Sequence, residues 1–171
     1  MSSEKESRRR ALRFAAHFVG LWLLLDVLTS LARPLHDLVN HGLARLMALV
    51  LPLVGLPCEA RGDTFYFHGT RARLDDPCNG IQLATILVAW VLASRTSWHR
   101  RGLAMRWMLP TLAALNLLRL FSLVGLTVFQ PALVDVVHLY VWQVGMMGAV
   151  MAMAVGWLRR EQAGAPRRPR G

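Results

Sequence analysis

Four long apolar runs, interrupted by few charged residues, dominate the chain. They cover residues 10–31, 80–94, 103–129 and 132–158. A helix needs about 20 such residues to cross the hydrocarbon core of a bilayer. The pattern therefore predicts an all-α polytopic membrane protein with four transmembrane helices. The 80–94 run is the shortest, and its helix spans a bilayer only if it begins close to Cys78 or stands nearly upright.

Residues 34–57, between the first two runs, have a different pattern. The first half predicts an amphipathic helix, with Leu35, Leu38, Val39, Gly42, Leu43 and Leu46 on one face and His36, Asp37, Asn40, His41 and Arg45 on the other. The second half, MALVLPLVGLP, is short and contains proline. We expect an interfacial or re-entrant segment here. The alternative is a fifth crossing, which would place the arginine-rich amino terminus outside the cell.

A turn-rich segment with mixed charges follows at residues 58–76. Its TFYF sequence is rich in aromatic residues and is bounded by Gly62 and Gly69, a pattern that predicts a short β-hairpin. With the amino terminus in the cytoplasm, this hairpin lies on the extracytoplasmic face. Residues 11–158 then form one membrane core, with basic cytoplasmic tails at 1–10 and 159–171.

Composition and charge support a membrane location. Apolar residues make up 54% of the chain, which is too many for an ordinary soluble domain. Fourteen of the twenty basic residues lie at helix ends, in three clusters: Lys5, Arg8, Arg9, Arg10 and Arg13; Arg95, Arg100, Arg101 and Arg106; and Arg159, Arg160, Arg167, Arg168 and Arg170. This distribution follows the positive-inside rule for a multi-pass protein of the cell (inner) membrane.

The same basic clusters argue against nucleic-acid binding, because the tails carry no interleaved aromatic residues. Contact with anionic membrane lipids is the simpler explanation. No small-residue cleavage site follows the first apolar run, so we expect a retained anchor there. The proline- and glycine-rich carboxyl-terminal tail is expected to be disordered.

Several charged or titratable residues lie inside the predicted spans, namely Asp26, Arg119, Asp135 and His138. Such residues cost roughly 2.5–3.5 kcal/mol at a helix centre and therefore indicate function. Arg119 lies roughly 12 Å below the outer end of its helix, too deep to reach the surface easily. Cys78, Arg119 and His138 all fall near the outer leaflet, so we expect them to converge. The start of a helix and a nearby arginine would both favour the reactive thiolate at Cys78.

Three motifs, PCNGIQ, NLLRL and LVDVVHLYVW, occur in this order after the predicted hairpin. Together with the preceding LVGLP they resemble the exosortase/archaeosortase family of membrane cysteine transpeptidases over residues 46–158. The chain is shorter than many members, so it is similar to a compact, core-only form, close to the exosortase H-like group. The order and spacing of the motifs make the resemblance specific, although each motif alone is common.

The resemblance implies a catalytic triad and a type of substrate. Cys78 matches the nucleophile, Arg119 the family arginine and His138 the third catalytic residue, while Gly80 and Asn116 match neighbouring motif positions. Family substrates carry a carboxyl-terminal signal made of a short motif, an apolar span and a basic cluster, as in the PEP-CTERM type. Asp135 is a candidate to orient His138, on the same helix. The activity implied is that of a cysteine peptidase or transpeptidase acting through a thioester.

Other interpretations of these residues remain open at this point. Cys78 and Cys58 can form a disulfide across the hairpin, and Arg119 can pair structurally with Asp26. A membrane thiol oxidoreductase is a second functional class, although it would be expected to carry a Cys-x-x-Cys pair. A non-catalytic assembly or transport subunit is a third. The histidines share no spacing typical of a metal site, so neither metal nor cofactor is expected.

Overall fold

The computed structural model describes residues 2–74 and 78–163. Its α-helices are α1 (Ser2–Leu31), α2 (Arg33–Val50), α3 (Ile81–Ala93), α4 (Trp98–Phe129), α5 (Val134–Val136) and α6 (Gln143–Ala163). Its other helical turns are the 3₁₀ turns η1 (Leu51–Val54) and η3 (Pro131–Leu133) and the π-helical turn η4 (Val137–Trp142). Its strands are β1 (Cys58–Arg61), β2 (Thr64–Phe67) and β3 (Thr70–Arg73).

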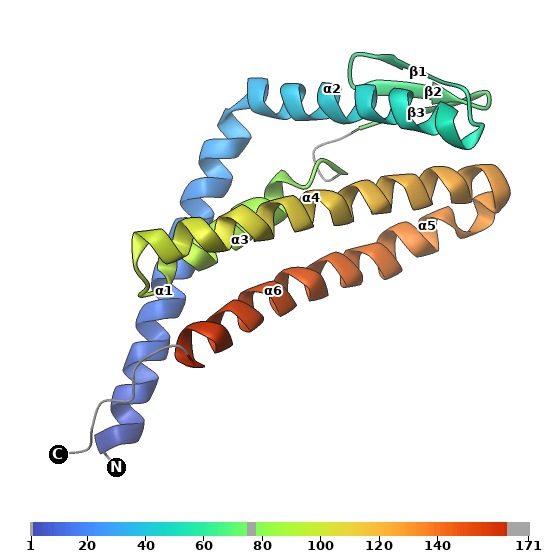
Figure 1. The fold of residues 1–171 in the computed structure, drawn as a ribbon. Helices are drawn as coiled ribbons and strands as arrows, with labels where there is room; N and C mark the ends of the chain where they lie inside the picture. The colour runs from blue at the N-terminus through green and yellow to red at the C-terminus, as the bar shows by residue number, and fades with distance from the viewer. Residues whose placement is uncertain (1, 75–77, 164–171) are drawn as a thin grey trace.

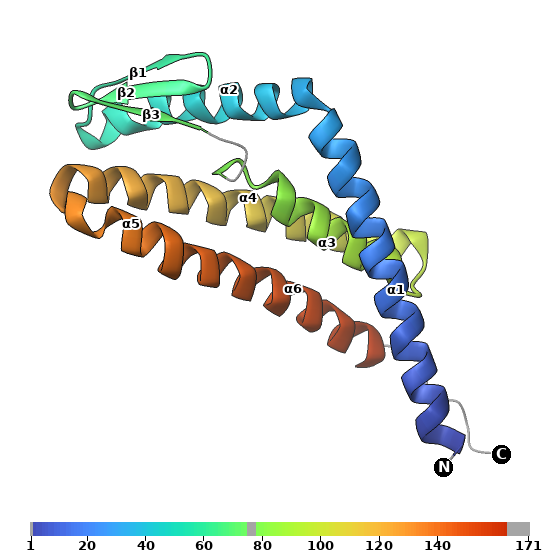
Figure 2. The same ribbon diagram turned by 180° about the vertical axis from the view of Figure 1, so that it is seen from behind.

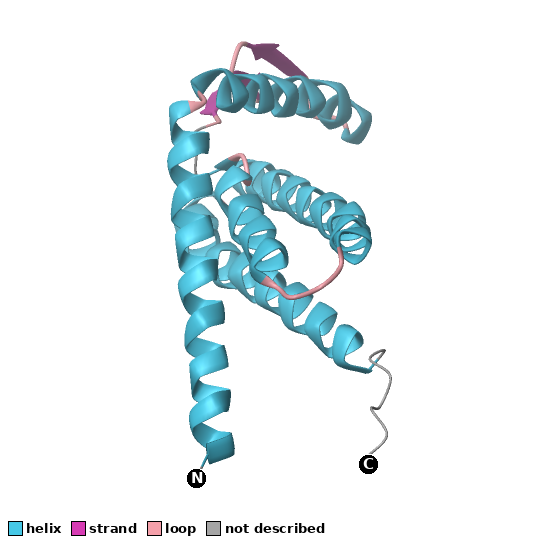
Figure 3. Ribbon diagram, turned by 90° about the vertical axis from the view of Figure 1, so that its left-hand side faces the viewer, coloured by secondary structure: helices cyan, strands magenta, loops and turns pink. Residues whose placement is uncertain are grey.

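The elements form two groups (Figure 1). One group contains α3, α4 and α6, and the other contains α2 and the small sheet. α4 and α6 run side by side and are joined at one end through η3, α5 and η4, while α1 crosses this group steeply and packs along α3 (Figures 1 and 2). α2 turns away from α1 after Ala32 and runs above α4, and the small sheet lies against its second half (Figure 3). The loop before α3 therefore lies where both groups meet.

One buried apolar cluster joins α3, α4 and α6. Its buried members are Leu87, Val91, Ala104, Met108, Leu112, Met146, Val150, Met153 and Trp157. Between helices in a membrane, van der Waals packing of such side chains supplies the stabilisation. This cluster therefore holds α4 against α6.

A second apolar cluster joins α2, the sheet and the far half of α4. Its buried members are Ala44, Met47, Leu51, Phe65, Phe67, Leu74, Leu120 and Val124. Phe65 and Phe67 alternate with the exposed Tyr66, as expected for a strand that has one packed face. Both Cys58 and Cys78 lie against this cluster, so the sheet and the loop before α3 share one core.

The predicted hairpin is a three-stranded antiparallel sheet in the order β1-β2-β3. The second turn, which the sequence prediction missed, is made by His68 and Gly69, whose φ values of +46° and +75° are both positive. Two successive positive φ values are typical of a tight type I′ hairpin turn. Asp75 and Asp76, at the end of the predicted hairpin, lie outside the described residues.

Within residues 2–74 and 78–163, four helical segments are long and apolar enough to cross a membrane, as the sequence predicts, but the set differs. They are Glu4–Leu31, Arg33–Val54, Trp98–Phe129 and Pro131–Arg160. The predicted span at 80–94 is the 13-residue helix α3, which is only about 20 Å long at 1.5 Å per residue. The segment at 34–57 contains the long helix instead, and its interfacial or re-entrant placement stays a prediction.

The two predicted faces of α2 have different surroundings. On the apolar face Leu38 is 70% exposed, as expected for a helix that turns this face toward lipid. On the polar face Asp37 and Arg45 are exposed, but Asn40 is only 6% exposed and His36 contacts Asn79 in the loop before α3. The sequence pattern did not predict that these two polar residues pack inward.

Both predicted tails contain helix. α1 begins at Ser2 and includes the basic segment, where Glu6 and Arg10 form an ion pair one turn apart at 3.4 Å. α6 continues to Ala163, so the first part of the tail at 159–171 is helical rather than disordered. Residues 164–171 lie outside the described part of the chain.

Candidate active site

Cys78 lies in the short turn that leads into α3. Gly80, directly before the helix, has φ of +79°, in the left-handed region that favours glycine. The Asn79 side chain folds over the first turn, and its Oδ1 accepts a hydrogen bond from the backbone N–H of Ile81 at 2.9 Å. The NG pair thus makes a tight turn that holds Cys78 at the start of α3.

His36 on α2 holds Asn79 from the other side. Its Nδ1 lies 3.1 Å from Asn79 Nδ2. Because Asn79 Oδ1 is already used by the Ile81 N–H, the amide nitrogen must be the donor and His36 Nδ1 the acceptor. His36 is therefore neutral in this bond, with its proton on Nε2. Neither Asn79 nor His36 was predicted from the sequence as part of the site. For Asn79 the available signal was an asparagine shortly before the start of a helix.

Asn116 connects the turn to α4. Its Nδ2 donates a hydrogen bond to the backbone carbonyl of Cys78 at 3.0 Å, and its side chain is only 3% exposed. A Cβ built on Gly80 would lie 3.4 Å from Asn116 Cγ, so the two residues are in direct contact. Asn116 therefore fixes the position of the Cys78 backbone relative to α4.

Arg119, one turn further along α4, contacts His138. The guanidinium lies 2.7 Å from His138 Nε2, and Arg119 is 6% exposed. Since arginine can only donate, His138 Nε2 is the acceptor and its ring proton is on Nδ1. His138 lies in η4, and π-helical turns of this kind occur frequently at functional sites.

Two polar atoms at this place are buried without a hydrogen-bond partner among the described residues. They are Arg119 Nε, a donor, and Asn116 Oδ1, an acceptor. Leaving such a group unpaired costs about 1–3 kcal/mol, and more for a charged one. A buried, positively charged donor without a partner can bind an oxygen atom of another molecule.

The comparison with protein families bears on this geometry. The model of the transmembrane exosortase family matches residues 6–158, which is most of the chain. The chain belongs to this family. The search among curated proteins and the search among solved structures returned no match.

The exosortase residues predicted from sequence are only partly brought together. Arg119 contacts His138, and Asn116 links Cys78 and Gly80 to the same helix. Among the described residues, the Cys78 thiol makes no hydrogen bond to Arg119 or His138. The thiol packs instead against the apolar cluster below the sheet.

Asp135 does not orient His138 in this structure. It is exposed on α5, and within residues 2–74 and 78–163 it forms no hydrogen bond or ion pair with the imidazole. The two residues are three positions apart in the chain, but the widened π-helical turn begins between them, at Val137. Arg119 is the side chain that orients His138.

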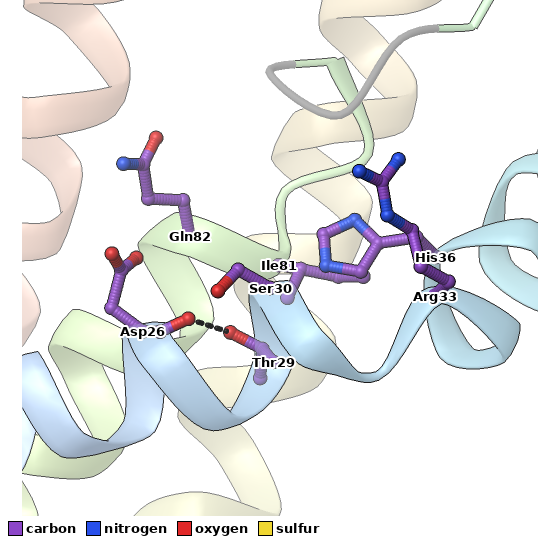
Figure 4. A pocket seen from close by; sticks show the side chains of 7 residues that line it. All are labelled: Asp26, Thr29, Ser30, Arg33, His36, Ile81 and Gln82. Atoms are coloured by element: carbon purple, nitrogen blue, oxygen red, sulfur yellow. Dashed lines mark hydrogen bonds between the residues drawn. The ribbon is translucent and has the colours of Figure 1, made fainter.

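Asp26 lies in a polar cavity of about 270 Å³ rather than beside Arg119 (Figure 4). The cavity is lined by Asp26, Thr29, Ser30, Arg33, His36, Ile81 and Gln82. No ion pair joins Asp26 to Arg119 in the described part of the chain, so the structural pairing considered from the sequence is not formed. His36 and Ile81 belong both to this cavity and to the contacts around Asn79, so the cavity adjoins the Cys78 turn.

Cys58 and Cys78 are both free thiols, so the disulfide considered above is absent. Cys58 lies at the start of β1, where burial and the neighbouring charge of Glu59 raise the pKa of its thiol. Less thiolate is then present at neutral pH, and the thiolate is the nucleophile. Cys58 is therefore the weaker candidate of the two.

The raised pKa of Cys58 predicts slow alkylation. In a Cys78→Ala variant Cys58 is the remaining thiol, and we expect maleimide at pH 7.5 to label the folded protein in detergent several-fold more slowly than the same variant denatured in SDS. Mass spectrometry of the intact protein gives both rates. Equal rates would contradict the environment described for Cys58.

Gly80→Ala should destabilise the turn. Alanine at φ of +79° costs roughly 1–2 kcal/mol. We expect a melting temperature lower by several degrees, since the strain of the left-handed backbone is the main effect of the added Cβ. Gly102→Ala is the matched control, because a Cβ there meets nothing within 4 Å and its φ is not positive. Equal melting temperatures for the two variants would refute the strained turn.

Proposed function

We propose that this exosortase-family chain is a membrane cysteine transpeptidase that uses Cys78 as its nucleophile. The observation that carries the proposal is the polar network buried at the loop before α3. In it, one face of α4 presents Asn116 to the Cys78 backbone and Arg119 to His138. Burying a guanidinium against an imidazole inside a membrane protein costs free energy, and a catalytic role would explain why this arrangement is present.

In the first step the Cys78 thiolate attacks a peptide carbonyl near the carboxyl-terminal anchor of a membrane-held substrate. The C–S bond forms, the peptide C–N bond breaks, and the thioester holds the amino-terminal part of the substrate. His138 takes the thiol proton and returns it to the leaving amine. Because Nε2 accepts from Arg119 in the resting site, Arg119 must turn toward the substrate before Nε2 can take a proton.

Arg119 is suited to stabilise the oxyanion of this step. Its Nε donor is buried and has no partner within the described residues. A donor fixed in a poorly hydrated site is stronger than one in water, and removing one oxyanion donor typically costs about 10²–10³-fold in rate. Substrate binding would thus move the guanidinium from the imidazole to the carbonyl oxygen.

In the second step an acceptor resolves the thioester. An amine, a lipid-linked acceptor or water attacks the carbonyl, the C–S bond breaks, and the acceptor proton passes through His138 to restore the thiol. The polar cavity beside the turn, which holds Asp26 and Gln82, offers the acceptor a route to Cys78 from the α1 side. Neither step needs a metal or an organic cofactor.

The proposed topology places this site on the extracytoplasmic side of the cell (inner) membrane. The three basic clusters lie on the amino end of α1, on the α3–α4 connection and the first part of α4, and on the end of α6 with the tail that follows. The positive-inside rule assigns these segments to the cytoplasm. The loop before α3 lies at the opposite end of that helix. Attachment of a membrane-impermeant maleimide to Cys78 in intact spheroplasts would test this side.

The test of the function is co-expression with a tagged substrate candidate. The reporter should end in a short motif, one apolar span and an arginine cluster, and is best taken from a gene beside the one for this chain. We expect the wild-type protein to remove the carboxyl-terminal segment, giving a shorter amino-terminal product. An unchanged reporter in the presence of folded protein, for every neighbouring candidate, would count against the proposal.

A further inference from the structure

A second cavity lies at the other end of α3, about 20 Å from the Cys78 turn at 1.5 Å per residue. It has a volume of about 440 Å³ and lies between α1 and the α3–α4 connection, where these two segments pack together (Figures 1 and 2). The residues that line it are Arg10, Arg13, Phe14, His17, Leu21, Leu92, Ala93, Ser94, Arg95 and Arg101. None of the proposed catalytic residues belongs to it.

The charge of this cavity has one sign. Arg10 and Arg13 come from one face of α1, whereas Arg95 and Arg101 come from a segment about 80 residues later in the chain. Among the described residues no acidic side chain lines the cavity, and Glu6 pairs with Arg10 at an exposed position. The positive-inside rule requires arginines on one side of the membrane, but it does not require them to converge on one cavity.

Arg101 is fixed in place at the cavity wall. One of its terminal nitrogens donates to the Ser94 carbonyl at 2.8 Å, and its guanidinium lies 4.5 Å from the centre of the Trp98 ring. Its Nε is buried and has no hydrogen-bond partner among the described residues. A buried, positively charged donor of this kind is suited to an anionic oxygen.

The rest of the wall is apolar. Phe14, Leu21 and Leu92 line the same cavity as the arginines, and the Phe14 ring packs edge-on against Trp90 with centroids 5.1 Å apart. Trp98 is exposed beside the basic group, where a tryptophan at a membrane–water boundary is expected. The cavity is therefore amphipathic, with a cationic part next to a part suited to acyl chains.

We propose that this cavity binds the phosphate of an anionic phospholipid. Arg13, Arg95 and Arg101 contact the phosphate oxygens, and the start of the acyl chains lies along Leu21 and Leu92. Basic pockets between membrane helices on the cytoplasmic side bind anionic headgroups in this manner. A bound lipid would join α1 to the α3–α4 connection. The proposal does not depend on the peptidase activity.

The test compares lipids and variants by native mass spectrometry of the full chain in detergent. The probes are phosphatidylglycerol, phosphatidylcholine and inorganic phosphate. The test variant is Arg13→Gln with Arg95→Gln, and the matched control is Arg106→Gln with Arg159→Gln, which removes the same charge from exposed positions outside the cavity. Removing two arginines should weaken phosphatidylglycerol binding by roughly 30-fold, at about 1 kcal/mol each.

We expect wild-type and control proteins to retain phosphatidylglycerol in preference to phosphatidylcholine, and the test variant to lose this preference. If millimolar inorganic phosphate competed for the cavity as effectively as phosphatidylglycerol, the cavity would be a free-phosphate site and the lipid assignment would be overturned. Equal weakening in test and control variants would show general surface attraction and overturn it as well. If the test variant does not purify as a single species, equal retention of the two lipids by wild-type protein refutes the proposal.

Discussion

Replacing Cys78 by alanine should abolish processing of a substrate that the wild-type protein shortens. In the proposed mechanism the Cys78 thiolate forms the acyl intermediate, so we expect a fall in rate of at least about 10³-fold. The variant should fold normally, since the side chain is only half-buried at the edge of an apolar cluster. Immunoblotting of the tagged substrate measures the result.

Cys58→Ala is the matched control for this experiment. Cys58 is the other cysteine of the chain, lies against the same apolar cluster, and is also a free thiol. We expect it to process substrate within about threefold of wild type, because surface and edge substitutions of this kind cost little. Equal loss of activity in both variants would point to a thiol pair and favour an oxidoreductase, whereas loss in Cys58→Ala alone would show that Cys58 is the required thiol and contradict the assignment of Cys78.

Replacing Arg119 by lysine should lower the processing rate by about 10²–10³-fold while the protein stays in the membrane. Lysine keeps the charge but loses the planar group that can serve His138 and a substrate oxygen in turn. His138→Ala should cost a similar amount, within the roughly 10²–10⁴-fold range of general acid–base catalysis. The measurement is the rate of substrate shortening in membranes with equal amounts of enzyme.

Arg106→Lys is the control for Arg119→Lys, because Arg106 lies on the same helix at an exposed position. We expect wild-type activity and an unchanged melting temperature. If Arg119→Lys processed substrate as fast as Arg106→Lys, the buried guanidinium would be structural. If it lost activity only through unfolding, its melting temperature would fall in parallel with its rate.

The class of fold follows from the sequence because apolar length is a local property. Runs such as 103–129 identify membrane helices without knowledge of their neighbours. The exact ends do not follow in the same way: α3 is shorter than its apolar run suggested, and α1 begins at Ser2. Helix ends depend on capping and on salt bridges such as Glu6–Arg10, which hydropathy does not measure.

The polar face of α2 shows where the pattern is insufficient. It groups Asn40 with Asp37 and Arg45, but Asn40 is buried and the other two are exposed, because helix periodicity does not show which residues meet another element. The third strand was missed because two of its four residues, TRAR, are arginines and the segment does not resemble a strand. It forms because the His68–Gly69 turn directs the chain back along β2.

The contact between Arg119 and His138 was predicted from their similar depth in the membrane, since both residues need a polar partner in an apolar environment. The roles of Asn79 and His36 were not predicted, because the hydrogen bond between them joins residues 43 positions apart. Sequence position gives the depth of a residue but not the angle of its helix. For the same reason the sequence left open a pairing of Asp26 with Arg119, whereas Asp26 lines a cavity with Arg33 and Gln82.

The most direct test of the central claim is capture of the acyl intermediate on Cys78. Enzyme co-expressed with a processed substrate should be quenched in acid, digested and analysed by mass spectrometry. A substrate-derived acyl group on the Cys78 peptide, removed by neutral hydroxylamine and absent from Cys78→Ala, is the predicted result. Substrate processing with the acyl group on Cys58 would contradict the account. An Arg119→Lys variant that processes substrate at the wild-type rate with no acyl group on Cys78 would contradict it as well.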